Sequence, residues 1–162
     1  AASVARRRGL GWIGIAALLL AALAALIVPL PGPLAPLRPD FVALAVLWLC
    51  LLSPRPTGLV VAFLAGLGAD AVHGMLLGQH ALALVVVAYV ALKLRLRIRA
   101  FPPLQQSAVV FALLAIGEFI VFWIDGVTGH AVTAWTRWLG VVVGAACWPL
   151  LAGLLERYLP RA

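Results

Sequence analysis

An acidic side chain lies in the middle of a long apolar stretch of this chain, residues 62–93 (AFLAGLGADAVHGMLLGQHALALVVVAYVALK). Asp70 and His73 are three residues apart, which places them on one side of a helix, so we expect them to pair. A buried carboxylate needs a hydrogen-bond partner or a counter-charge. Asp70 therefore has three interpretations: a polar clamp on a neighbouring helix or on the turn at 74–80, a group coupled to ions or protons, or a contact for a partner or ligand.

A second acidic residue, Glu118, also lies within an apolar stretch, and we expect it to face the protein interior. The chain has three histidines, His73, His80 and His130. They form no HExxH pattern, and no serine or cysteine is paired with them in the sequence. Cys50 and Cys147 each lie inside an apolar run, so we expect no disulfide, no metal site and no redox pair. We predict a protein that is not an enzyme and holds no cofactor.

The composition limits the solvent in which this chain can fold. Hydrophobic residues make up 65% of its 162 residues, and the mean hydropathy is +1.15. A soluble fold of this length cannot hide so much apolar surface, so we expect lipid to surround most of it. The net charge of +7 would suggest nucleic acid in a soluble protein, but the positions of the charges favour a membrane, and we predict no nucleic-acid partner. The length fits a single integral membrane domain, 1–162.

Proline, glycine and charged residues divide the chain into apolar segments, which predict an all-α membrane protein built as a bundle of six transmembrane helices. The six segments are 10–30, 39–53, 57–77, 79–94, 104–124 and 136–155. A bilayer core about 30 Å thick needs roughly 20 helical residues, so the second and fourth segments are short. We expect them to be shielded by neighbouring helices, broken, or placed in a thin region.

The basic residues predict the orientation of the bundle, because lysine and arginine are retained on the cytoplasmic side during insertion. With six spans and a cytoplasmic N-terminus, ten of the twelve basic residues lie inside, and only Arg38 and Arg137 lie outside. The inner set includes the motif KLRLRIR, whose charged members are Lys93, Arg95, Arg97 and Arg99. We interpret this motif as a cytoplasmic anchor held by anionic lipid, with a protein-docking patch as the alternative. Both termini are then cytoplasmic.

Small residues mark the faces that we expect to pack closely, since glycine lets helices approach one another in lipid. Gly66 lies with Asp70 on such a stripe, while Leu67 is expected to face lipid, and Gly78 lies in the turn that follows. The last segment carries Gly140, Gly144, Trp148 and Pro149. The first two form a GxxxG pattern, which indicates either packing within the bundle, with a kink at the proline, or a face for a partner helix or a homodimer.

Taken in order, several short motifs resemble the rod shape-determining protein MreD family. They are RPDF at 38–41, AFLAGLGAD at 62–70, LLGQHALAL at 76–84, VAYVALKLR at 87–95, LQQSAVV at 104–110, VFWIDG at 121–126 and CWPLL at 147–151. The similarity runs from about residue 38 to 155. Recurring positions of the family fall on Gly66, Asp70, Gly78, Ala81, Leu82, Trp123 and Pro149. Leu47 and Leu104 depart from it, because aromatic residues are expected there.

The resemblance implies a subunit of the cell-elongation machinery in the bacterial inner membrane. Its implied partners are MreC and, through MreC or in a larger complex, the MreB filament and the glycosyltransferase RodA with its transpeptidase. The resemblance also implies a six-helix fold similar to the substrate-binding components of energy-coupling factor transporters. It implies neither an enzymatic activity nor a ligand.

Two functions are open from the sequence. The first is a non-catalytic membrane scaffold that binds a single-span partner and helps to couple MreB filaments to peptidoglycan synthesis. The second is a small-molecule binding or transport subunit with a polar intramembrane site around Asp70 and Glu118. A polar-lined cavity of a few hundred Å³ that opens to the outer side would favour the second function, whereas a filled core would favour the first.

Overall fold

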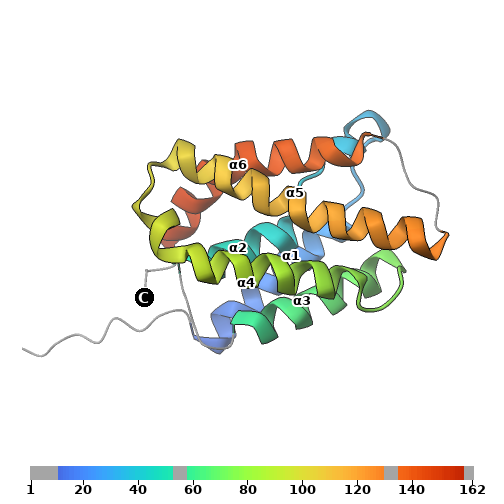
Figure 1. Cartoon of the computed structure of the whole chain (residues 1–162), viewed down its shortest axis with the longest axis horizontal. Helices are drawn as coiled ribbons and strands as arrows, with labels where there is room; N and C mark the ends of the chain where they lie inside the picture. The colour runs from blue at the N-terminus through green and yellow to red at the C-terminus, as the bar shows by residue number, and fades with distance from the viewer. Residues whose placement is uncertain (1–10, 53–57, 130–134, 159–162) are drawn as a thin grey trace, which may run out of the picture.

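Helices account for almost all of the structure, a computed structural model that describes residues 11–52, 58–129 and 135–158. Figure 1 shows six α-helices packed side by side along the long axis, with one short 3₁₀ helix. They are α1 (Trp12–Ile27), η1 (Gly32–Leu37), α2 (Phe41–Leu52), α3 (Gly58–His73), α4 (Gln79–Ala100), α5 (Pro103–Thr128) and α6 (Arg137–Tyr158). The described residues contain no strand, and the prediction of an all-helical fold with six helices is confirmed.

Helix α2 forms the centre of the bundle. Residues 42–51 are all buried, and α2 packs against α1, α3, α4 and α6, while α5 packs against α4 and α6. A helix that is apolar on every side is stable only when other helices or lipid cover all of its faces. Its neighbours therefore shield the short second apolar segment. Shielding is one of the outcomes expected from the sequence for this segment.

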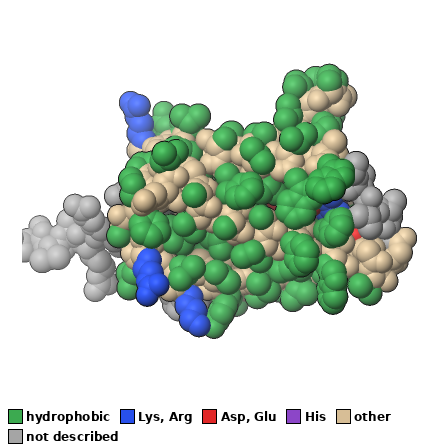
Figure 2. All heavy atoms as spheres, turned by 45° about the horizontal axis from the view of Figure 1, so that its top comes forward, with side chains coloured by type: hydrophobic (Ala, Val, Ile, Leu, Met, Phe, Trp, Pro, Cys, Tyr) green, Lys and Arg blue, Asp and Glu red, His purple; other side chains and the backbone are tan. Residues whose placement is uncertain are grey.

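The outside of the bundle is mostly apolar. Large exposed side chains include Leu20 on α1, Leu64 on α3, Phe119 on α5 and Leu150 on α6. In Figure 2, hydrophobic side chains cover the visible side, and separate lysine and arginine side chains project at the left end. An apolar belt between charged ends is the pattern expected of a protein surrounded by lipid.

Three helical stretches in the described ranges are long and apolar enough to cross a membrane: Gly32–Leu51, Pro103–Thr128 and Arg137–Tyr158. Helices α1 and α3 are apolar but only 16 residues long. Helix α4 has 22 residues, the last of which carry the basic motif. The structure thus confirms the six helices, whereas six membrane crossings stay a prediction.

Three helix ends differ from the sequence-based prediction by four residues or more, and one of them is the end of α5, which continues to Thr128 instead of ending at 124. Helix α4 continues through the basic motif to Ala100 instead of ending at 94, because long basic side chains can extend away from the helix and need not interrupt it. Helix α3 ends at His73 rather than at 77. Gly74 has a φ of +64°, and the Met75 N–H donates to the Asp70 carbonyl at 3.1 Å, which is a glycine-terminated helix end.

Candidate functional site

Asp70 connects the end of α3 to the start of α4. Its side chain is fully buried. The Gly78 N–H donates to Asp70 Oδ2 at 2.8 Å, and the His80 N–H donates to Oδ1 at 2.9 Å. Gly78 is the N-cap residue of α4 and has no side chain to cap it, so Asp70 caps α4 from the neighbouring helix. Asp70 thus lies inside the protein and on the backbone of the 74–80 turn, which is the geometry expected of the polar-clamp interpretation, one of the three given for this residue.

His80, rather than His73, is the imidazole that contacts Asp70. His80 Nδ1 lies 2.8 Å from Asp70 Oδ1, and we assign the hydrogen to Nδ1 because an ionised carboxylate only accepts. His73 Nδ1 lies 2.9 Å from the Ala69 carbonyl on its own helix, and its ring stacks on that of His80 with centroids 5.1 Å apart. The predicted Asp70–His73 pair is therefore wrong, because the packing of α4 on α3 brings a distant histidine to the carboxylate.

An ion-pair cluster ties α4, α5 and the start of α6 together. Arg137 Nε lies 2.5 Å from Glu118 Oε1, and Arg137 Nη1 lies 2.7 Å from Asp125 Oδ2. Asp125 and Gln79 are buried, and Gln79 Nε2 donates to Asp125 Oδ1 and to the Val121 carbonyl. Glu118 faces the interior as predicted, with a quarter of its side chain exposed (25%). We call Arg137, Glu118, Asp125 and Gln79 the Arg137 cluster.

The segment between η1 and α2 contributes a third polar group. Asp40 Oδ1 accepts from the N–H groups of Val42 and Ala43, both at 3.0 Å, and so caps the start of α2. Arg38 donates through Nη2 to the Ala25 carbonyl near the end of α1. Its Nε is buried without a hydrogen-bond partner. These two residues hold the first helices against the end of the bundle that carries the Arg137 cluster.

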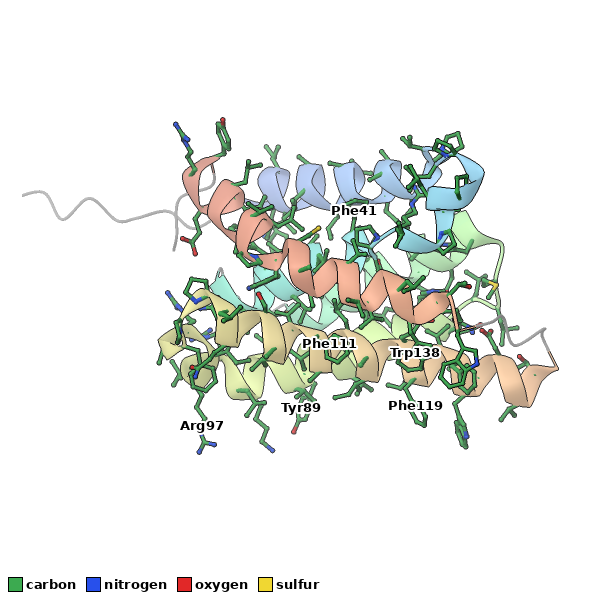
Figure 3. The ribbon with its side chains drawn as sticks, turned by 90° about the horizontal axis from the view of Figure 1, so that it is seen from above. Phe41, Tyr89, Arg97, Phe111, Phe119 and Trp138 are labelled. Atoms are coloured by element: carbon green, nitrogen blue, oxygen red, sulfur yellow. The ribbon has the colours of Figure 1, made fainter. Side chains whose placement is uncertain are left out.

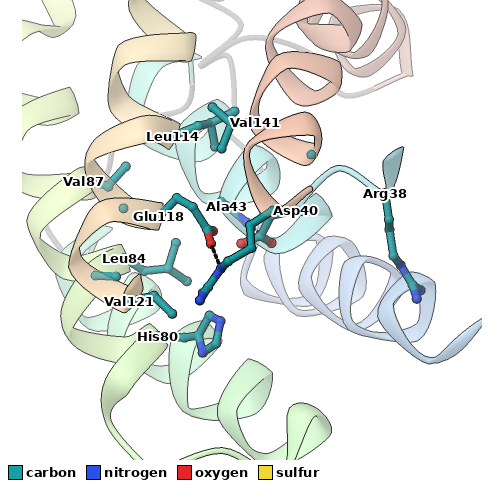
Figure 4. A pocket seen from close by; sticks show the side chains of 14 residues that line it. Arg38, Asp40, Ala43, His80, Leu84, Val87, Leu114, Glu118, Val121 and Val141 are labelled. Carbon is teal, nitrogen blue, oxygen red and sulfur yellow. Dashed lines mark hydrogen bonds and ion pairs between the residues drawn. The ribbon is translucent and has the colours of Figure 1, made fainter. Parts of the chain in front are cut away.

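The three polar groups surround a cavity at this end of the bundle. Its volume is about 600 Å³, and it opens to the outside of the protein. A deeper recess of about 80 Å³ lies between α2, α4, α5 and α6. The two spaces share five lining residues, Arg38, Asp40, His80, Glu118 and Arg137. Figure 4 shows His80, Glu118 and Asp40 around the recess, while the Arg38 side chain extends away toward α1.

We call the larger space, of about 600 Å³, the outer cavity. Its lining carries groups of both charge signs. Carboxylates come from Asp40, Glu118 and Asp125, guanidinium groups from Arg38 and Arg137, and imidazoles from His73 and His80. Such a lining can hold a polar molecule or receive a polar side chain of another protein. Over the described ranges, no group of three or more His, Cys, Asp or Glu side chains could hold a metal ion.

The predicted packing glycines lie where backbones approach each other within the chain. A Cβ atom on Gly66 would lie 2.3 Å from Ala81 Cα, and one on Gly140 would lie 2.6 Å from the Arg38 carbonyl oxygen. Gly144 is buried against Leu114. The GxxxG face of α6 is therefore occupied inside the bundle, which supports the packing interpretation and leaves this face unavailable for a homodimer or a partner helix.

The remaining predicted site residues lie away from the outer cavity. Trp148 is buried in the core, and its indole N–H donates to Gln106 Oε1 at 3.4 Å, while Pro149 is exposed within α6. The basic motif occupies the opposite end of α4 from His80. Lys93, Arg97 and Arg99 are exposed there, and Arg95 is half-buried.

Several residues of the outer cavity were not singled out from the sequence as site residues. Asp125 lies seven residues after Glu118, two helical turns on, so both carboxylates share one face of α5. Arg38 and Arg137 were the two basic residues that the orientation rule placed outside. These two signals together could have predicted a charged site at the outer end. Nothing in the sequence predicts the contribution of Gln79, which depends on how α4 packs on α5.

Comparison with known proteins relates the chain to one family. Residues 6–158 match the family model described as rod shape-determining protein MreD. The chain is 27% identical over 148 residues to a protein of Haemophilus influenzae named rod shape-determining protein MreD, and the alignment covers 91% of each chain. No solved structure matches, so the similarity to the substrate-binding components of energy-coupling factor transporters stays a prediction.

Proposed function

Because this chain belongs to the rod shape-determining protein MreD family, we propose that it is a non-catalytic scaffold of the cell-elongation machinery in the bacterial inner membrane. The observation that carries the proposal is the family match, which extends over residues 6–158 and so includes all six helices. The proposed direct partner is MreC, and MreB and RodA with its transpeptidase are reached through MreC or in a larger complex. In this arrangement the chain contributes helix faces and outer loops to the complex.

The exposed apolar helix faces support a partner that lies in the membrane. Figure 3 shows Phe119 of α5 and Tyr89 of α4 projecting from the outside of the bundle, and Phe111 of α5 is exposed as well. Phe119 and Trp123 are 56% and 65% exposed, and aromatic side chains of this size supply much of the contact at protein interfaces. Lipid covers these faces when no partner does.

The test replaces the native protein of a depleted rod-shaped strain with this chain and recovers MreC by co-purification. Photo-crosslinking residues are placed at exposed positions, one on each outer helix: Leu20, Leu64, Tyr89, Phe119 and Leu150. We expect rod shape to be restored and MreC to be captured from one or two adjacent helices only. Restored rod shape without any MreC capture would contradict the proposed partner. Failure to restore shape at normal protein levels would contradict the scaffold role.

The outer cavity supports a second candidate function, a subunit that binds a small polar molecule. A cavity of about 600 Å³ lined by charged residues is large enough for such a ligand, and the bundle is not filled at this end. A ligand held by the residues that the cavity and the recess share would extend into the recess, so filling the recess separates the two functions. Ala83→Val adds volume at the recess, and Ala112→Val, on the exposed face of α5, is the matched control.

A scaffold tolerates a filled recess, because apolar volume added to an existing cavity is commonly neutral or stabilising. A ligand-dependent protein instead loses its function at unchanged protein levels. The measurement is rod-shape complementation read beside the amount of protein in membranes. Loss of shape with Ala83→Val but not with Ala112→Val would favour the ligand function, and rod shape with both would favour the scaffold.

A further inference from the structure

Helix α4 presents one exposed stripe that is apolar toward the start of the helix and basic toward its end. Leu82, Tyr89, Lys93 and Arg97 follow each other at spacings of seven, four and four residues, which keeps them on one face of a helix. Leu82 and Tyr89 are each 53% exposed. Figure 3 shows Tyr89 and Arg97 projecting on the same side of the bundle. We call these four residues the α4 stripe.

The basic end of the stripe is not neutralised by the protein. Lys93 Nζ lies 5.7 Å from the centre of the Tyr89 ring. Within the described ranges, neither Lys93 nor Arg97 makes an ion pair with a carboxylate. Asp40, Glu118 and Asp125 line the outer cavity at the other end of the bundle, and Glu156, in the last turn of α6, forms no ion pair with Lys93 or Arg97 in the described ranges. Two cations on an exposed helix face are therefore available to an anion from outside the chain.

Helix geometry sets the depths of these groups. With a rise of about 1.5 Å per residue, Lys93 lies about 6 Å beyond Tyr89 along α4, and Arg97 lies about 6 Å beyond Lys93. Tyrosine is favoured at the boundary between acyl chains and headgroups. When Tyr89 lies at that boundary, Lys93 lies at the level of the phosphates and Leu82 lies beside the acyl chains. Arg97 lies further out, and its long side chain can extend back toward the phosphates, since helical side chains point toward the N-terminus of their helix.

We propose that the α4 stripe binds one anionic phospholipid, with its phosphate between Lys93 and Arg97 and an acyl chain along Tyr89 and Leu82. The inference rests on the proposed membrane location, but it does not depend on which leaflet the basic end faces. The combination of a cationic end and an apolar track on the same helix face fits a lipid, because both halves of the molecule are recognised. A soluble anion or a nucleic acid would use only the basic end.

The test uses native mass spectrometry of the full chain, released from detergent with equal amounts of phosphatidylglycerol and phosphatidylcholine of identical acyl chains. The wild type is expected to retain phosphatidylglycerol preferentially. Each basic residue near an anionic surface contributes a factor of about five, so Lys93→Gln with Arg97→Gln is expected to reduce that preference about 10- to 30-fold. The matched control, Arg95→Gln with Arg99→Gln, removes the same charge from other faces of α4, away from the proposed phosphate, and is expected to change the preference less than Lys93→Gln with Arg97→Gln does.

Equal reductions by the two double variants would overturn the proposal, because they would indicate attraction by net charge rather than a site on one face. Absence of any preference in the wild type would overturn it as well. If Lys93→Gln with Arg97→Gln leaves lipid retention unchanged but lowers MreC recovery, the stripe binds protein and the proposal is wrong. Since lipid retention is measured on the purified chain alone, its outcome is independent of the proposed scaffold role.

Discussion

Asp70 supplies the N-cap that Gly78, which has no side chain, cannot supply to α4. Gly78 has a φ of +105°, a conformation in which other residues are strained, yet a glycine N-cap has no side-chain oxygen for the first N–H groups of the helix. In lipid, unsatisfied N–H groups are costly. The Asp70 carboxylate accepts two of them and also the His80 ring, and its negative charge is favourable at the positive end of the helix dipole.

Substitutions of Asp70 test this cap. Both carboxylate oxygens accept backbone hydrogen bonds, so Asp70→Asn keeps one acceptor and turns an amide N–H₂ group toward the other donor. We expect Asp70→Asn to lower the free energy of unfolding by about 1–3 kcal/mol and Asp70→Leu to lower it more. His80→Phe, which removes only the side-chain donor, is expected to cost less than either. Unfolding followed by circular dichroism in detergent micelles gives the comparison.

The same variants distinguish a structural role from proton or ion coupling. If Asp70 acts by titration, Asp70→Asn folds normally but fails to restore rod shape, since an amide cannot titrate. If Asp70 acts as a cap, loss of shape follows loss of folded protein for every variant in the series. Full stability of Asp70→Asn together with round cells would therefore count against the cap.

The stability of the Arg137 cluster depends on the balance between its one cation and its two carboxylates. Removing the guanidinium with Arg137→Met takes away the cation that the carboxylates of Glu118 and Asp125 share. We expect a loss of about 3 kcal/mol, near the lower end of the range for a broken buried pair, because Glu118 is partly exposed. Adding Glu118→Gln to Arg137→Met is expected to restore part of that stability. The measurement is the unfolding midpoint of the single and double variants, and a double variant less stable than Arg137→Met would contradict the pairing.

At the residue scale, the sequence predicted burial better than partners. An isolated carboxylate in an apolar segment must be satisfied by protein, which is why the inward position of Asp70 could be predicted. Its partner is ten residues away on another helix, and helical spacing alone favoured the nearer His73. Partners across helices depend on packing, which a single sequence does not specify.

At the scale of helices, close approach of α3 and α4 requires Gly66. Gly66→Leu directs a bulky side chain at the backbone of Ala81, and we expect it to lower stability by about 3 kcal/mol or more. Leu64→Ala is the control, because Leu64 is 59% exposed and its truncation is expected to cost less than about 0.5 kcal/mol. Leu67, which the sequence placed in lipid, is half-buried and does not serve as this control. The comparison uses the amount of folded protein extracted from membranes, and equal losses would show that α3 is misoriented.

Helix α6 offers a matched pair of glycines. A methyl group on Gly140 would meet the Arg38 carbonyl oxygen, whereas one on Gly153 would meet nothing within 4 Å. We expect Gly140→Ala to lower the unfolding midpoint and Gly153→Ala to leave it unchanged or raise it, since alanine favours helix. A lower midpoint for both variants would show that the loss does not come from the contact with Arg38.

At this scale the sequence was informative about helix number and less so about helix ends. Apolar segments bounded by proline and glycine gave six helices because those residues interrupt helices for reasons of backbone geometry. Charge is a weaker boundary, and α4 continues six residues past its predicted end. The η1 turn between α1 and α2 was not predicted, because its prolines indicate a break without specifying a 3₁₀ conformation.

At the scale of the whole molecule, the two ends of the bundle differ in charge. One end carries the outer cavity, where acidic and basic groups pair. The other carries the exposed basic residues of α4. In the predicted orientation, the basic residues of α4 lie on the cytoplasmic side and Arg137 lies outside. The charge of Arg137 is balanced by carboxylates within the protein, which would lower the cost of this outside position. The ion pairs of Arg137 thus offer a physical reason why this arginine is one of the two basic residues that the predicted orientation places outside.

This asymmetry predicts the orientation of the chain in the membrane. We expect reporter fusions after Arg99 and after Arg161 to report the cytoplasm, and a fusion after Gly32, in the connection between α1 and α2, to report the outer side. Alkaline phosphatase, which is active only outside, and a fluorescent protein that folds only inside give complementary readings. An external signal after Arg99 would overturn the orientation. An external signal after Arg161 with an internal one after Arg99 would instead mean that only one of α5 and α6 crosses the membrane. The number of crossings would then be odd, and the C-terminal tail would lie on the same side as the outer cavity.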